Sequence, residues 1–101
     1  MKSLYVFYEN QRVGVFSRDE NLMSSFFYDE QWLMGQNSFP LSLAMPLSKQ
    51  TFNNKITLSF FENLLPEGDV RDALERDHNV HGSFEFLARF GQVRSVMHIY
   101  L

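Results

Sequence analysis

The chain has 101 residues, a formal net charge of −3 and no cysteine. That length suffices for one domain, residues 1–101, with a core of its own. The lack of cysteine excludes disulfides, thiolate catalysis and cysteine-ligated zinc. The acidic balance argues against nucleic-acid binding, which usually needs a basic face.

The composition is rich in apolar side chains, with 45% hydrophobic residues and eleven phenylalanines. Such a domain either packs a dense core or keeps apolar surface for a partner. No signal peptide is predicted, because the polar residues at 9–12 interrupt the N-terminal apolar run. No membrane span is predicted, because no apolar run approaches the roughly 20 residues of a span. We therefore expect a soluble, cytoplasmic domain without membrane contact.

The N-terminal quarter predicts an antiparallel meander of three strands. Residues 4–8 and 13–16 are β-branched and aromatic, and the polar link at 9–12 favours a hairpin between them. Residues 22–28 supply the third strand. Gly14, inside the second run, indicates a bulge or a close approach of backbones.

The next segment breaks the strand pattern. A short helical turn is predicted over 29–35, with Asp29 as its N-cap and Gly35 at its end. Residues 39–47 lie between prolines and alternate large and small side chains, which predicts a short edge strand. Residues 49–55 are polar and indicate a surface loop.

Two helices are predicted around Pro66. Apolar spacing predicts the first over 57–65 and the second over 67–77. The residues expected to face the core are Leu58, Phe61, Leu64 and Leu65 in the first helix and Val70, Ala73 and Leu74 in the second.

The chain closes with a third helix over 84–90, with Ser83 as its cap and Gly91 just past its end. Residues 96–100 alternate and are predicted to return to the sheet as a strand. The predicted fold class is therefore α+β: a small antiparallel sheet, made of the meander and a C-terminal strand, packed with about three helices.

Two groups of residues could carry chemistry. His78 and His81, with Asp77 beside them, have a spacing that could hold a metal. Glu62 and Glu67 flank the proline corner and could form an acid–base pair. A solvated turn explains the first group more simply, and a helix end followed by a helix start explains the second, so no catalytic, cofactor or metal residue is predicted.

The motifs carry a resemblance to a known family. The chain resembles the N-terminal subdomain of HipA-type serine/threonine kinase toxins over about residues 4–91. The matching pieces, in order, are Leu4-Tyr5-Val6 with Val13-Gly14, Phe27-Tyr28-Asp29-x-x-Trp32-Leu33, Pro40-Leu41-Ser42-Leu43-x-Met45-Pro46, Phe60-Phe61-Glu62-Asn63-Leu64-Leu65-Pro66-Glu67-Gly68-x-x-Arg71 and Phe84-x-Phe86-Leu87-x-x-Phe90-Gly91.

The chain departs from that family after Gly91. There it reads Gln92-Val93-Arg94-Ser95-Val96-Met97 instead of the family's acidic-Cys-x-Gly-Ala stretch. The kinase's ATP-binding loop and catalytic aspartate would lie beyond Leu101, so no kinase activity is expected. A free-standing copy of this subdomain is similar to the HipS antitoxins of HipBST toxin–antitoxin systems.

That resemblance implies an inhibitor that binds a HipT-like kinase toxin, within a complex that also holds a HipB-like helix-turn-helix DNA-binding protein. The alternative is a structural or activating subunit that completes a truncated kinase without inhibiting it. Trp32 is the leading candidate for partner contact, since tryptophan is enriched at binding hot spots. Glu67 and Arg71 are further candidates. A core position for Trp32, and a corner-fixing role for Glu67 and Arg71, are the competing interpretations.

Overall fold

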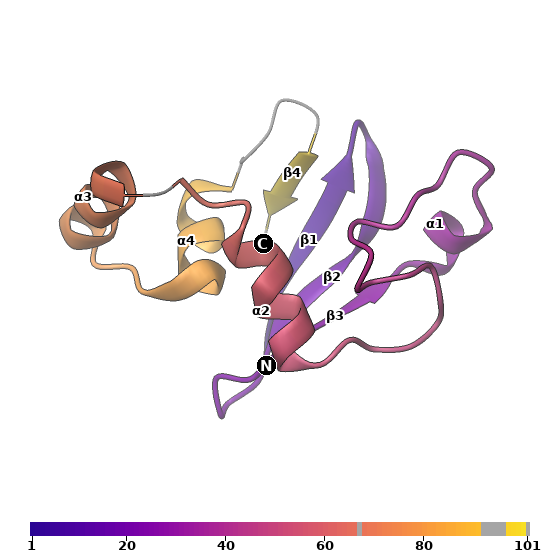
Figure 1. The fold of residues 1–101 in the computed structure, drawn as a ribbon, viewed down its shortest axis with the longest axis horizontal. Coiled ribbons are helices and arrows are strands. Elements are labelled where there is room, and N and C mark those ends of the chain that lie inside the picture. The colour runs from indigo at the N-terminus through magenta and orange to yellow at the C-terminus, as the bar shows by residue number, and fades with distance from the viewer. Residues whose placement is uncertain (67, 92–96, 101) are drawn as a thin grey trace.

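The computed structural model describes residues 1–66, 68–91 and 97–100. It contains a four-stranded antiparallel sheet in the order β3-β2-β1-β4, with helices around it (Figure 1). The elements in chain order are β1 (Lys2–Tyr8), β2 (Gln11–Arg18), β3 (Ser24–Tyr28), α1 (Glu30–Met34), α2 (Asn54–Glu62), α3 (Gly68–His78), α4 (Gly82–Phe90) and β4 (Met97–Tyr100). The predicted α+β class, the meander and the returning C-terminal strand are confirmed.

The hairpin between β1 and β2 is tighter than predicted. Its turn is Glu9-Asn10, with Glu9 at a positive φ of 55°, so Gln11 and Arg12 already belong to β2. Val6 pairs with Gly14 but Phe7 pairs with Arg12, which leaves Val13 as the extra residue of a bulge.

Gly14 also permits a close approach to β3, as predicted. A Cβ there would collide with the Phe27 carbonyl oxygen and would lie 2.6 Å from Cζ of Phe26. Any larger side chain would have to push β2 away from β3.

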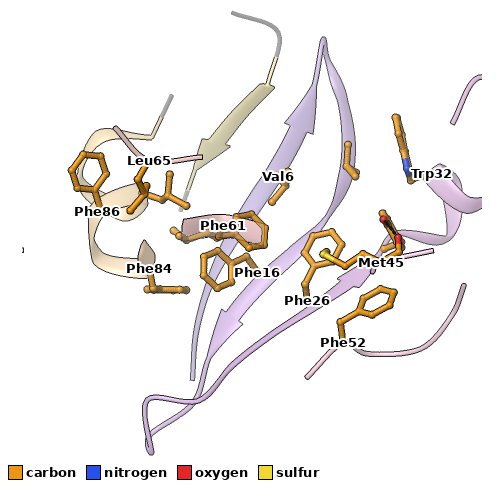
Figure 2. Packing of buried hydrophobic residues seen from close by; sticks show 14 of the residues in the cluster. Val6, Phe16, Phe26, Trp32, Met45, Phe52, Phe61, Leu65, Phe84 and Phe86 are labelled. Carbon is orange, nitrogen blue, oxygen red and sulfur yellow. Dashed lines mark hydrogen bonds between the residues drawn. The ribbon is translucent and has the colours of Figure 1, made fainter. Parts of the chain in front are cut away.

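The core lies between the sheet and helices α2 and α4. Phe61 of α2 stacks on Phe16 of β2 with ring centroids 4.1 Å apart, and Phe84 of α4 meets Phe16 edge-on at 5.0 Å. Leu4, Val6 and Phe26 complete the sheet side of this layer. Figure 2 shows the core continuing from Phe84 and Phe86 to Phe52, Met45 and Trp32.

Helix α2 begins three residues before the predicted start. Asn53 is its N-cap, and its side chain accepts a hydrogen bond from Ile56 N at 3.0 Å. Of the predicted inward positions, Phe61 is buried and Leu58 is partly buried. Leu65 is also buried, but it lies past the end of α2 at Glu62, so the predicted helix end at 65 was wrong.

Two further local predictions were wrong, and the one for Asp29 was right in position only. Asp29 stands at the N-cap of α1 without a capping side-chain bond, because its carboxylate pairs with Arg12 at 2.5 Å. Ser83 lies inside α4 with its side chain buried, and His81 takes the N-cap position. Val70 of α3 is 61% exposed rather than inward-facing. Gly91 does end α4, at a φ of 73°.

The predicted edge strand over 39–47 was also wrong. That segment is a loop whose only ladder contact in the described structure is the isolated bridge between Ser42 and Met45. The partner of β3 at this edge is instead Phe52, whose backbone exchanges two hydrogen bonds with Phe26. Prolines 40 and 46 remove two donors that a ladder would need.

Candidate partner-binding surface

Trp32 lies in the core of the structure. It is 3% exposed, and its indole meets the rings of Tyr8 and Phe39 edge-on, at centroid distances of 6.3 and 5.3 Å. Its Nε1 donates a hydrogen bond to the Phe39 carbonyl at 3.3 Å, and Ser38 Oγ donates to the Trp32 carbonyl. Trp32 therefore holds the start of the 39–47 segment in place from inside the domain.

Arg71 joins two helices. Its guanidinium lies 2.8 Å from Glu62 Oε2 at the end of α2, and 3.4 Å from Glu75 Oε1 one turn along α3. All three side chains are partly exposed, so each pair contributes less than about 1 kcal/mol. The corner between α2 and α3 is thus fixed by Arg71. Glu67, the other residue predicted there, lies outside the described residues.

The histidines are not assembled into a metal site. His78 packs edge-on against Phe90 with its Nδ1 3.4 Å from an Arg89 nitrogen, and His81 begins α4. Among the side chains described in residues 1–66 and 68–91, no three His, Asp or Glu come together as metal ligands.

One shallow cleft opens beside β3 and α1. Its lining mixes both charges with apolar side chains and consists of Arg12, Phe27, Tyr28, Asp29, Glu30, Gln31, Leu33 and Lys49. Arg12 is already engaged, because it pairs with Asp29 and its guanidinium lies 5.0 Å above the Tyr5 ring. The hydrogen bond to Asp29 raises the pKa of Arg12. Through these contacts Arg12 links the β1–β2 hairpin to the start of α1.

Four exposed apolar side chains lie along the segment from α1 into the loop after it. Figure 1 shows this segment on the β3 side of the sheet, away from α3 and α4. We call this the 34–47 surface and define it by Met34, Phe39, Leu43 and Leu47. Met34 is 82% exposed and Leu43 is 100% exposed. Exposed apolar groups clustered on one segment are typical of an interaction site.

The loop that carries this surface is held tightly. The Tyr28 hydroxyl accepts a hydrogen bond from Leu41 N at 2.9 Å and donates one to the Met45 carbonyl at 2.5 Å. Met45 N bonds the Ser42 carbonyl at 3.0 Å, which closes a tight turn with Leu43 and Ala44 at its tip. Burial raises the pKa of Tyr28, and the bond from Leu41 N opposes that rise.

Sequence reasoning chose Trp32 and overlooked Leu43. A signal for Leu43 exists: residues 31–48 carry no Asp, Glu, Lys or Arg, although 21% of the chain is charged. The cores of protein interfaces are depleted of charge in the same way. Because Leu41, Leu43 and Met45 alternate as in a strand, a strand was predicted here instead of a turn.

The structure is a small α+β domain with exposed apolar side chains along the 34–47 surface. None of its described helices has the length and hydropathy to cross a membrane. Residues 4–94 match the model of the HipA N-terminal domain family. The chain belongs to that family, as its motifs predicted.

A relative of the chain carries the same kind of sequence within a larger protein. Over 71 residues, the chain is 34% identical to a protein of Sinorhizobium fredii (strain NBRC 101917 / NGR234) described as putative kinase Y4mE. The match covers 70% of this chain but only 17% of that protein. The chain thus spans a small part of the relative's length.

Proposed function

We propose that this domain is an antitoxin that binds a HipT-type serine/threonine kinase toxin and inhibits it. The observation that carries the proposal is the family match over residues 4–94. Similarity to part of a putative kinase favours a kinase as the partner. The exposed 34–47 surface supports a role in binding.

The proposed mechanism is steric. The domain docks where the N-terminal subdomain of a HipA kinase would sit, and blocks lobe closure or substrate access. Phosphoryl transfer requires the lobes to close around ATP and metal, so a bound wedge is enough to stop it. The inhibitor needs no catalytic, metal or cofactor residue for this role, and no nucleic-acid or membrane contact.

The three predicted contact residues take different parts in this proposal. Trp32 supports the 34–47 surface from inside the domain. Arg71 shapes the corner between α2 and α3, where Glu67 also belongs in sequence. The complex would form in the cytoplasm with a HipB-like DNA-binding protein as its third member.

Growth assays test the proposal. A HipT-type kinase from the same genome is induced alone and together with this chain, and binding is measured with the purified proteins. Growth arrest by the kinase alone and rescue by the chain are expected. Arrest that persists in the presence of the folded chain would refute an antitoxin role.

The same assay separates the alternative, a structural or activating subunit. That alternative has its own support, since the relative is described as a kinase and is similar to the chain over 71 residues. A kinase that is inert alone and becomes toxic only with this chain would establish it in place of the antitoxin. Autophosphorylation of the purified kinase, with and without the chain, gives the same distinction in vitro.

A further inference from the structure

The tip of the 39–47 loop presents an apolar side chain that the fold itself does not use. Leu43 is 100% exposed, and its neighbours Ser42 and Ala44 are small, so the leucine stands clear of the loop. Leu41 and Met45, two residues away on either side, point into the domain and are partly or fully buried. The turn thus sends alternate apolar side chains in opposite directions.

The backbone that presents this side chain is tied to the rest of the domain by hydrogen bonds. The Tyr28 hydroxyl bonds both sides of the loop, at Leu41 N and at the Met45 carbonyl. Met45 itself is fully buried, and Figure 2 places it in the core near Phe26 and Phe52. A loop backbone that is already ordered loses little conformational entropy when its tip docks, which favours affinity.

The chemistry around Leu43 also fits a protein pocket. Residues 31–48 are uncharged, and Met34, Phe39 and Leu47 flank the tip along the chain. A lipid surface would be met by apolar side chains beside lysine and arginine, which this segment lacks. A desolvated apolar pocket on a folded protein matches the segment better.

The similarity to part of a putative kinase favours a kinase as the occupant of this surface. In the Sinorhizobium relative, the matched region is part of a much larger protein and covers only 17% of it. A domain that is part of a much larger putative kinase needs a defined surface that packs against the rest of that protein. We propose that Leu43 is the anchor residue by which this domain docks into an apolar pocket of the HipT-type kinase, an inference that rests on the proposed function.

The test compares two exposed leucines that both lie on turns. Leu43→Ser alters the anchor, and Leu22→Ser alters the leucine of the β2–β3 turn, which is 67% exposed. Affinity for the purified HipT-type kinase is measured by calorimetry for the wild type and both variants. We expect Leu43→Ser to weaken binding about tenfold or more, as for a hot-spot residue, and Leu22→Ser to change it less than about twofold.

Folding does not confound this comparison. Both side chains are exposed, so both variants should melt within about 4 °C of the wild type. A second variant, Met34→Ser, tests the neighbouring part of the surface and should weaken binding by a smaller factor than Leu43→Ser.

The outcomes separate the two proposals. If the wild type does not bind the kinase, the proposed function fails. If the wild type binds and Leu43→Ser binds equally well, the antitoxin role stands and the anchor is refuted. Sedimentation gives a further check: a wild-type dimer that becomes a monomer in Leu43→Ser would assign the tip to a second copy and also overturn the inference.

Discussion

Replacing Tyr28 with phenylalanine should loosen the 39–47 loop while leaving its exposed side chains unchanged. The substitution removes one oxygen that both accepts from Leu41 N and donates to the Met45 carbonyl. Each bond contributes about 0.5–1.5 kcal/mol, and an unpartnered buried carbonyl adds a further penalty. We expect the free energy of unfolding to fall by about 2–3 kcal/mol.

That loss is large for a domain of this size but does not abolish folding. Domains of about 100 residues have stabilities of about 5–15 kcal/mol, and each kcal/mol shifts Tm by about 4–8 °C. Urea unfolding followed by circular dichroism measures the change. Kinase affinity should fall as well, because the anchor then has to be ordered on binding.

Tyr8→Phe provides the matched control. The Tyr8 ring packs on Trp32 and Phe39, and within the described residues its hydroxyl makes no hydrogen bond. Tyr8→Phe deletes the same hydroxyl oxygen but breaks no hydrogen bond, so the free energy of unfolding should change by less than about 0.5 kcal/mol. Equal effects of Tyr28→Phe and Tyr8→Phe would refute the clamp by the Tyr28 hydroxyl.

Three more predictions follow from the geometry. Burial raises the pKa of Tyr28 above the unfolded value of about 10. The stabilisation by the protonated hydroxyl is therefore complete below that pH and is lost as pH rises through the folded pKa. Urea midpoints should fall more steeply between pH 9 and 11 in the wild type than in Tyr28→Phe. Gly14→Ala should destabilise by about 1–3 kcal/mol in the same titration because its Cβ meets the β3 backbone, and an unchanged midpoint would disprove that close contact. Arg71→Gln should change global stability by less than about 1 kcal/mol but speed amide exchange in α3, with unchanged α3 protection as the contrary result.

Local sequence patterns predicted much of this fold. The aromatic and β-branched runs located the strands, and the apolar spacing placed Phe61 on the inner side of α2. Gly14 signalled both the bulge and the close approach of β3. These features depend on neighbours in sequence or on backbone geometry, which the residue types report directly.

The failures share a physical reason. Asp29 is a good capping residue, but Arg12, from a different strand, takes its carboxylate. Leu41, Leu43 and Met45 alternate as in a strand, but Tyr28 folds them into a turn. Val70 looked like a core residue, but α3 stands at the periphery and its described side chains include none that is fully buried. Each outcome was decided by a distant contact.

The uncharged stretch at 31–48 has a consequence for how fast a complex would form. Attraction between opposite charges steers encounters, and rates that depend on it fall as salt is added. Docking through an uncharged tip adds no local attraction of this kind, so we expect association at about 10⁵–10⁶ M⁻¹s⁻¹, with little dependence on salt beyond that from the chain's net charge of −3. The dissociation rate of the complex, rather than its association rate, would then determine how long the partner stays inhibited.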